Sequence, residues 1–404
     1  MDGCFDLMHY GHANALRQAK ALGDELVVGL VPDAEILRCK GPPIMQEAER
    51  LEMIESVKWV DEVITGVPYD LTPEFLHDLI HKHKIDYVIH GDDPCLLPDG
   101  TDAYAYAKKA GRFRMIKRTE GVSTTDIVGR MLMCSRDNAR FAQDRVMLTR
   151  EFSRGATGEN EVHTGQDGFD KAFAQGEDGT VNIDGAADVP AMQKTPSKKT
   201  PTIKTYPGSV RVSRFMPTSR RIVQFSSGKS APQGGKIVYI DGAFDLFHVG
   251  HVEILKAARA QGDFLLVGIH TDEEVQERRG PHLPIMGLHE RALSVLACRY
   301  ADEVIIGAPQ IITDDLLTTF GIDLVVRGTV HEATDREAAS EVERYKAPKA
   351  RGILRTIFSP SDLTSASLIR RIMSKRAEFE EKQARKSQSE AAYYASAKQY
   401  VNEI

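Results

Sequence analysis

The chain has 404 residues, enough for two or three domains, and its 42% hydrophobic and 27% charged residues are ordinary for a soluble globular protein. The net charge of −6 argues against a dedicated nucleic-acid binder, which normally carries a basic excess. The five cysteines are scattered and include no CxxC pair, which fits reduced thiols better than a disulfide framework or a zinc site. No apolar run approaches the roughly 18 residues of a membrane span, and the first residues show no signal-peptide pattern.

We therefore expect a cytoplasmic protein. Peripheral attachment to the endoplasmic reticulum or the mitochondrial outer membrane stays open, since an anchor could precede Met1 in a longer form. A homodimer also stays open, because nothing in the composition decides the oligomeric state.

The predicted elements of the first part alternate between strands and helices. Residues 25–31 and 87–90 are short, nearly continuous apolar runs, typical of strands buried on both faces. Residues 13–22 and 47–57 have the apolar spacing of helices. This alternation predicts an α/β domain with a parallel sheet covered on both sides, which binds ligands at the carboxyl ends of its strands.

One segment of the chain occurs twice. Residues 2–12, DGCFDLMHYGH, recur as residues 241–251, DGAFDLFHVGH. Further matches follow in the same order, among them residues 43–45 with 284–286 and residues 49–50 with 290–291. The period is far too long for a solenoid repeat, so the pattern indicates duplication of a whole domain.

Composition places the boundaries of the two copies. We assign residues 1–150 to an N-terminal catalytic domain and residues 236–373 to a degenerate second domain. Residues 151–235 form a linker that we expect to be largely disordered to about residue 205, whereas residues 211–225 are more apolar and suit packing against a domain. Residues 374–404 predict a charged C-terminal helix, which we expect to be solvated because its apolar residues are sparse.

The two copies begin differently. The second copy opens with the apolar run Lys236–Ile240, which fits a central first strand, whereas the first copy has only Met1 before Asp2. We therefore expect the first domain to lack its first strand, as a truncated or alternatively started product would. Loss of a central strand is expected to expose apolar surface and to displace residues 2–12, which continue directly from it.

The first candidate site is the run His9-Tyr10-Gly11-His12 between a strand and a helix. Two imidazoles at a helix N-terminus suit a phosphate, because backbone N–H groups and the helix dipole favour anions there. Gly11 is expected to let the backbone approach the ligand. Taken alone, HxGH is equally a chance match or half of a metal site. Its recurrence at residues 248–251 in the same context favours a function.

The second candidate site is RTEGVSTTD at residues 118–126, which precedes a helical pattern. Its hydroxyl and carboxylate residues are good helix caps, so simple capping is one interpretation. The other is a second phosphate site, with hydroxyls and N–H groups at the helix start and the forked guanidinium of Arg118 beside them.

HxGH followed by RTEGVSTT resembles the cytidylyltransferase family, which transfers CMP from CTP to an alcohol phosphate on a Rossmann-like α/β fold. The tandem arrangement is similar to the branch that acts on phosphoethanolamine and yields CDP-ethanolamine and pyrophosphate for phosphatidylethanolamine synthesis. The resemblance covers nearly the whole chain except the linker and tail. It implies two tandem Rossmann-like nucleotidyltransferase domains, the small-molecule substrates CTP and phosphoethanolamine, and Mg²⁺ that accompanies CTP without a dedicated metal site.

The resemblance assigns roles to matching residues of the first copy. His9 and His12 hold the CTP phosphates, Lys40 bridges CTP and the incoming phosphate, and Arg118 lines the nucleotide site. The remaining implied nucleotide contacts are Cys4, Phe5, Gly11, His90, Gly91, Thr119, Glu120, Gly121, Val122, Ser123 and Thr124.

Asp92 is expected to face the substrate amine and Tyr69 to lie near the headgroup. Both weakly favour a primary ammonium over a quaternary one. Phosphocholine and glycerol 3-phosphate are the alternative acceptors. A nucleotide-binding protein weakened by the missing strand is the alternative outside enzymes.

The second copy departs from the family pattern. Arg279 replaces Lys40, and residues 359–362, SPSD, stand where the first copy has RTEG. Our hypothesis is that this half binds a cytidine nucleotide but transfers CMP poorly or not at all, since arginine spreads its charge over a planar fork. The residues of this second nucleotide site are Ala243, Phe244, His248, Gly250, His251, Arg327, Gly328, Thr364 and Ser365.

Overall fold

Parallel strands alternate with helices in both halves of the computed structural model, which describes residues 1–93, 95, 97, 100–134, 217–330, 337–382 and 384. The predicted tandem α/β fold is confirmed. The expected disordered stretch of the linker and the last twenty residues of the charged tail lie outside the described residues.

The second half contains a five-stranded parallel sheet in the order β10-β9-β6-β7-β8. Its strands are β6 (Ile237–Gly242), β7 (Phe264–Ile269), β8 (Glu303–Ile306), β9 (Leu324–Gly328) and β10 (Leu354–Ile357). Its helices are α8 (Val249–Arg259), α9 (Asp272–Arg279), α10 (Leu288–Ala297), α11 (Asp314–Thr319), α12 (Glu337–Arg344), α13 (Lys346–Ala350) and α14 (Ser365–Ser374), preceded by α7 (Pro217–Phe225).

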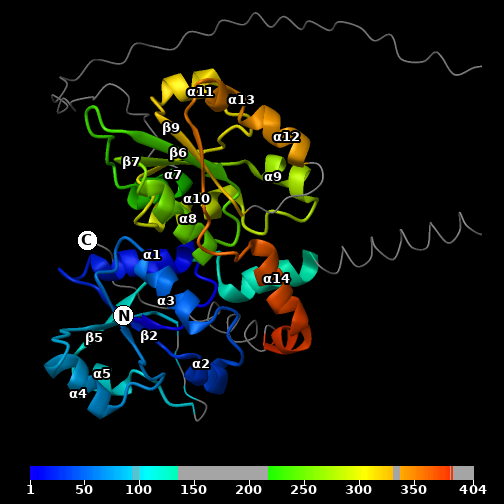
Figure 1. The fold of residues 1–404 in the computed structure, drawn as a ribbon. Coiled ribbons are helices and arrows are strands. Elements are labelled where there is room, and N and C mark those ends of the chain that lie inside the picture. Colours follow the sequence, from blue (N-terminus) through cyan, green and yellow to red (C-terminus); the bar gives the residue numbers. More distant parts are fainter. Residues whose placement is uncertain are drawn as a thin grey trace, which may run out of the picture. The chain divides into compact units, whose positions relative to one another are not determined.

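Strand β6 shows why this sheet is covered on both faces. Val238 and Ile240 belong to the apolar cluster that also holds side chains of α8 and α10, whereas Tyr239 belongs to the cluster on the other side with α11. Because successive side chains of a strand point to opposite faces, an unbroken apolar run needs a layer of helices on each side. Figure 1 shows these layers, with α11, α12 and α13 opposite α8 and α10.

The first half repeats this layout with a divided sheet. Strands β1 (Asp2–Gly3), β2 (Val27–Leu30) and β3 (Glu62–Thr65) form one sheet, and β4 (Val88–Gly91) pairs separately with β5 (Phe113–Ile116). The helices are α1 (Tyr10–Lys20), α2 (Asp33–Lys40), α3 (Glu47–Glu55), α4 (Pro73–His81), α5 (Ala105–Lys109) and a helix whose described part is 124–134.

The division of the sheet follows from the length of β1. In the second half, β6 pairs with β9 through Val238 and Tyr239. Asp241 matches Asp2 and Ile240 matches Met1, so these two pairing residues have no counterpart in the first half. Strand β1 therefore pairs with β2 but forms no ladder with β4. The N-terminal ammonium of Met1 donates to the Val27 carbonyl at 2.8 Å, and burial lowers the pKa of this amine.

The short strand does not displace the turn that follows it. Asp6 is buried, and its carboxylate accepts the backbone N–H groups of Ile44 at 2.8 Å and Met45 at 2.9 Å. Asp245 holds the equivalent backbone groups in the second half at 2.7 and 2.9 Å. The expected displacement of residues 2–12 is therefore not observed, because this turn is fixed by side-chain bonds that do not involve the first strand.

The two halves contact each other through equivalent surfaces. Arg130 pairs with Glu290 of the other half at 2.7 Å, and Arg371, at the matching position of the second copy, pairs with Glu49 at 2.6 Å. An isolated antiparallel bridge also joins Val57 to its own counterpart in the second copy, Cys298. A residue that pairs with its own counterpart is the property of a two-fold interface, so the duplicated domains pack as the subunits of a symmetric dimer do.

Helix α7 packs against α10. Phe225, at its end, is fully buried and meets Trp59 edge to face, with ring centroids 5.0 Å apart. Within the described ranges, no helix combines the length and the apolar character that crossing a membrane requires.

Candidate active site and its second copy

A cavity of about 240 Å³ opens in the first half, beside the N-termini of α1 and the helix 124–134. It lies at the carboxyl ends of β1 and β4, where a parallel sheet places its ligands. Most residues that the sequence singles out line it, namely Cys4, Phe5, His9, Gly11, His12, Lys40, His90, Gly91, Arg118, Thr119, Val122, Ser123 and Thr124.

The histidine pair is held by the start of α1. His9 is the N-cap residue, and its Nδ1 accepts the N–H of Gly11 at 3.1 Å. The Nδ1 of His12 accepts the N–H of His9 at 3.4 Å, and the two rings stack with centroids 4.0 Å apart. Because Nδ1 of each ring faces the backbone, both imidazoles are fixed in orientation before any ligand arrives.

Gly11 lines the cavity, where its expected approach to a ligand stays a prediction, and it also has a packing role. A Cβ at this position would lie 2.8 Å from Cγ1 of Val122 and 2.9 Å from the His9 ring. Glycine is therefore needed so that the loop before helix 124–134 can pack closely on the histidine turn. This contact brings the two candidate phosphate sites together.

The loop at residues 118–124 is tied to its surroundings at several points. Asn14 of α1 donates to Thr119 Oγ1 at 2.9 Å, and Thr124 Oγ1 donates to the carbonyl of Asp6 at 3.2 Å. Ser123 Oγ accepts the N–H of Asp126 at 3.0 Å, which is the helix-cap interaction that the sequence left as an alternative. Ser123 therefore caps the helix and also lines the cavity.

Two members of this loop lie outside the cavity lining. Glu120 is exposed and its carboxylate is 3.2 Å from the ammonium of Lys117. Gly121 has a φ of 82°, a left-handed conformation that glycine adopts without steric cost, so it forms the turn. Their predicted nucleotide contacts stay predictions.

Lys40 reaches the cavity from the C-terminal end of α2. Its ammonium lies 5.1 Å from the centroid of the Tyr69 ring, a cation–π distance. The Tyr69 hydroxyl in turn accepts a hydrogen bond from Cys95 Sγ at 3.4 Å, and burial raises the pKa of both groups, which keeps them protonated. Tyr69 thus contacts the lysine from outside the cavity lining, and its headgroup contact stays a prediction.

The carboxylates of Asp2, Asp6 and Asp93 line the cavity, whereas the predicted Asp92 is not among its lining residues, and its contact with the substrate amine stays a prediction. Asp92 Oδ1 accepts the backbone N–H of Arg118 at 2.9 Å, so this side chain anchors the loop instead of facing the cavity. Asp2 Oδ2 accepts the hydroxyl of Tyr104 at 2.8 Å, and the ring of Tyr104 lies 4.6 Å from that of His90. The sequence offered a signal for both missed residues, because Asp2 and Tyr104 recur at the matching positions 241 and 345.

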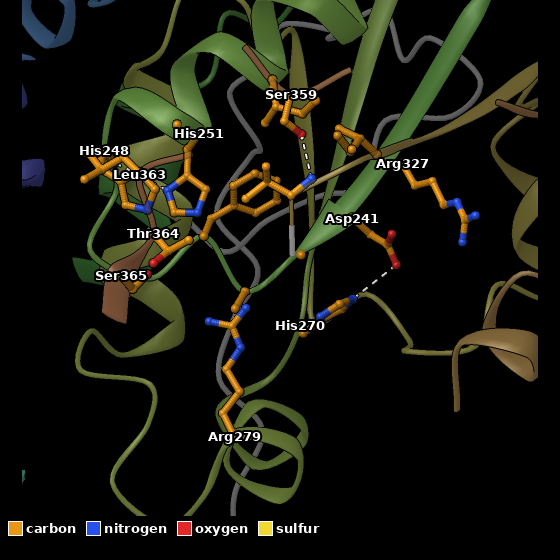
Figure 2. Close-up of a pocket in the computed structure, with 18 of the residues that line it drawn as sticks. Asp241, His248, His251, His270, Arg279, Arg327, Ser359, Leu363, Thr364 and Ser365 are labelled. Carbon is orange, nitrogen blue, oxygen red and sulfur yellow. Dashed lines mark hydrogen bonds and ion pairs between the residues drawn. The ribbon is translucent and has the colours of Figure 1, made fainter. Parts of the chain in front are cut away.

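The second half has an equivalent cavity of about 250 Å³ (Figure 2). His248 and His251 stack at 3.9 Å, as their counterparts do, and Ser365 Oγ donates to the Asp245 carbonyl at 2.8 Å. Burial lowers the pKa of His248 to about 3 and holds that of His251 well below its ordinary value, so both rings are neutral at pH 7. All residues predicted for this site line the cavity, namely Ala243, Phe244, His248, Gly250, His251, Arg327, Gly328, Thr364 and Ser365.

The opposite end of this second cavity differs from that of the first. Figure 2 shows Asp241 and His270 there, with Arg279 extending toward the centre. Asp241 matches Asp2, but its Oδ1 is 2.8 Å from the guanidinium of Arg344 and its Oδ2 is 3.1 Å from His270 Nε2. Burial alone would raise the pKa of Asp241, yet Arg344 and His270 lower it to about 2. The carboxylate is thus ionised and already neutralised from within the protein.

Comparisons with known proteins agree with this arrangement. A family model described as cytidylyltransferase-like matches residues 1–130 and 239–372. An ethanolamine-phosphate cytidylyltransferase of Arabidopsis thaliana is 52% identical over 395 residues, which cover 98% of this chain and 84% of that protein. The protein of the same name from Mus musculus is 41% identical over 401 residues, covering 98% of this chain and 91% of its own length.

A probable choline-phosphate cytidylyltransferase of Schizosaccharomyces pombe is 46% identical over 133 residues, but the match covers 32% of this chain and 36% of that protein. The ethanolamine-phosphate relatives therefore share the duplicated arrangement that this partial match does not span. The chain belongs to the cytidylyltransferase family, in the tandem branch represented by these ethanolamine-phosphate cytidylyltransferases.

Proposed function

We propose that the first half transfers CMP from CTP to phosphoethanolamine, giving CDP-ethanolamine and pyrophosphate. The observation that carries this proposal is a single cavity in which two helix N-termini, the histidine pair and Lys40 meet a carboxylate, Asp2. The helix N-termini, the histidine pair and Lys40 suit the phosphates of the two substrates, and the carboxylate of Asp2 suits an ammonium group. The names of the relatives that match nearly the whole chain, ethanolamine-phosphate cytidylyltransferases, support the same reaction.

The chemistry needs no nucleophilic side chain. A phosphate oxygen of the acceptor attacks the α-phosphorus of CTP, a new P–O bond forms, and the bond to the departing pyrophosphate breaks. Such transfers depend on positioning and on stabilising the charge of the transferring group. His9 and His12 are fixed beside the helix start to stabilise that charge, and Lys40 is placed to hold both substrates together.

We propose that Mg²⁺ enters as a complex with CTP. Within the described ranges, no group of three or more His, Cys, Asp or Glu side chains is arranged to hold a metal ion. Mg²⁺ commonly keeps several waters and binds mainly through substrate phosphates, which suits a cavity of this kind. When bound, the ion would neutralise phosphate charge.

Asp2 is the residue that we propose for recognition of the acceptor amine. Its carboxylate lines the cavity and accepts the Tyr104 hydroxyl, which leaves oxygen lone pairs for a primary ammonium with three N–H donors. A quaternary ammonium has no such donors and gains less from a carboxylate. In the second half the same carboxylate is neutralised by Arg344, so we propose that this half binds a nucleotide without efficient transfer to phosphoethanolamine.

Replacing Asp2 with asparagine is expected to raise the KM for phosphoethanolamine by roughly 10–100-fold, the loss of one charged hydrogen bond, with the KM for CTP little changed. Asp92→Asn is the matched comparison, because its amide oxygen can still accept the Arg118 N–H. Steady-state kinetics with each substrate varied in turn distinguish the two carboxylates. A larger effect on the acceptor KM in Asp92→Asn would return the amine to the position expected from the sequence.

The proposed reaction is tested by incubating the full chain with CTP, Mg²⁺ and phosphoethanolamine and separating the nucleotide products. We expect CDP-ethanolamine and pyrophosphate in equal amounts, with far slower product formation from phosphocholine or glycerol 3-phosphate. Faster turnover of either alternative acceptor would refute the assignment of the substrate. Thermal stabilisation by CTP without any product would favour a nucleotide-binding protein.

A further inference from the structure

The charged segment that follows α14 lines the first active-site cavity. Residues 376–382 are helical, and Phe379 and Lys382 both face the cavity of the first half. Phe379 is only 3% exposed and belongs to the main apolar cluster. This part of the tail is therefore not the solvated helix that its sparse apolar residues led us to expect.

Two contacts place the segment beside the catalytic lysine. Arg371, in the last turns of α14, holds Glu49 of the first half with two bonds of 2.6 and 2.8 Å. Lys382 Nζ donates to the carbonyl of Pro42 at 3.3 Å. Pro42 follows Lys40 by two residues, so the two lysines approach the same corner of the cavity, one from each half of the protein.

The electrostatic surroundings of Lys382 suit an anion. Burial lowers the pKa of Lys382, Asp6 acts in the opposite direction, and the positive charge of Lys40 lowers it further. Asp6 is itself buried, and its oxygens already accept the backbone N–H groups of Ile44 and Met45. Lys382 is half-buried, and the positive charges of Lys382 and Lys40 repel each other unless an anion joins them. The phosphate-bearing substrates of this cavity supply that anion.

We propose that Lys382 donates to a substrate phosphate beside Lys40, so that the segment beyond the second half completes the active site of the first. The inference rests on the proposed cytidylyltransferase reaction and adds a phosphate-binding residue to it. The shared chemistry is a phosphate group, which either CTP or phosphoethanolamine presents. It also gives the second half a function that does not require turnover, because that half holds α14 and the segment after it in place.

The test uses the full chain with Lys382→Gln, which removes the charge and keeps the length, and Lys382→Arg, which keeps the charge. Lys375→Gln, on an exposed position of the same segment, is the control. We expect Lys382→Gln to raise the KM of one phosphate substrate by roughly tenfold or more, as for a lost charged hydrogen bond. Lys382→Arg should recover most of this loss, and Lys375→Gln should match the unmodified chain. The substrate whose KM rises identifies the phosphate that Lys382 contacts.

Calorimetric titration with CTP, and separately with phosphoethanolamine, measures the same interaction without turnover. Unchanged KM values and unchanged affinities for both substrates in Lys382→Gln would overturn the inference. So would equal losses in the Gln and Arg variants, since a merely structural role depends on shape and not on charge. If the unmodified chain formed no CDP-ethanolamine but its CTP affinity still fell in Lys382→Gln, the proposed function would fail while the phosphate contact stood.

Discussion

A His12→Ala variant is expected to lose about 10²–10³-fold in kcat for CDP-ethanolamine formation, the usual effect of removing one fixed donor to a developing charge. The His12 ring is stacked on His9 and oriented by a backbone N–H, so it needs no rearrangement when charge develops on the transferring phosphoryl group. Because that stabilisation is greatest in the transition state, kcat should fall more than the affinity for CTP. Rapid-quench or steady-state product assays at saturating CTP measure the change.

The second copy supplies the control for this experiment. His251→Ala removes the matching ring, which stacks on His248 in the same way. We expect its kcat to stay within a few-fold of the unmodified chain, since the second half lacks Lys40 and has a neutralised Asp241. Equal losses in the two variants would show that both halves contribute to turnover. Losses in His251→Ala alone would place the reaction in the second half.

The repeat in the sequence predicted that the two halves share one fold. Asp6 and its partners Ile44 and Met45 recur as Asp245 with Ile285 and Met286. An aspartate that holds two backbone N–H groups some forty residues away fixes the same turn in both copies. The alternation of apolar runs then gave the parallel sheets.

The orientation of individual side chains was harder to predict. Asp2 and Asp92 are both carboxylates near strand ends, and sequence spacing alone does not say which one turns to a backbone N–H. Contacts between the two halves could not be predicted from the sequence for a different reason. Lys382 is far from Lys40 in the sequence, and tertiary contacts such as the burial of Phe379 and the bond from Lys382 to Pro42 bring it near.

The first copy has Lys40 at the position where the second copy has Arg279. Lys40→Arg is expected to lower kcat by about 10²-fold although the charge is kept, because a planar fork cannot replace a compact ammonium that serves two phosphates at once. The larger guanidinium would also meet the Tyr69 ring, whose centroid lies 5.1 Å from the lysine ammonium. Lys40→Met, without the charge, should lose at least as much.

The matched control is Arg279→Lys, which gives the second copy the residue of the first. We expect no gain in CDP-ethanolamine formation, because Arg344 still neutralises Asp241 and the RTEG sequence is still absent. Initial rates of the three variants at saturating substrates decide the matter. Near-normal turnover in Lys40→Arg would mean that charge alone is needed at this position. The poor transfer that we propose for the second half would then have to result from Asp241, whose carboxylate is already paired with Arg344.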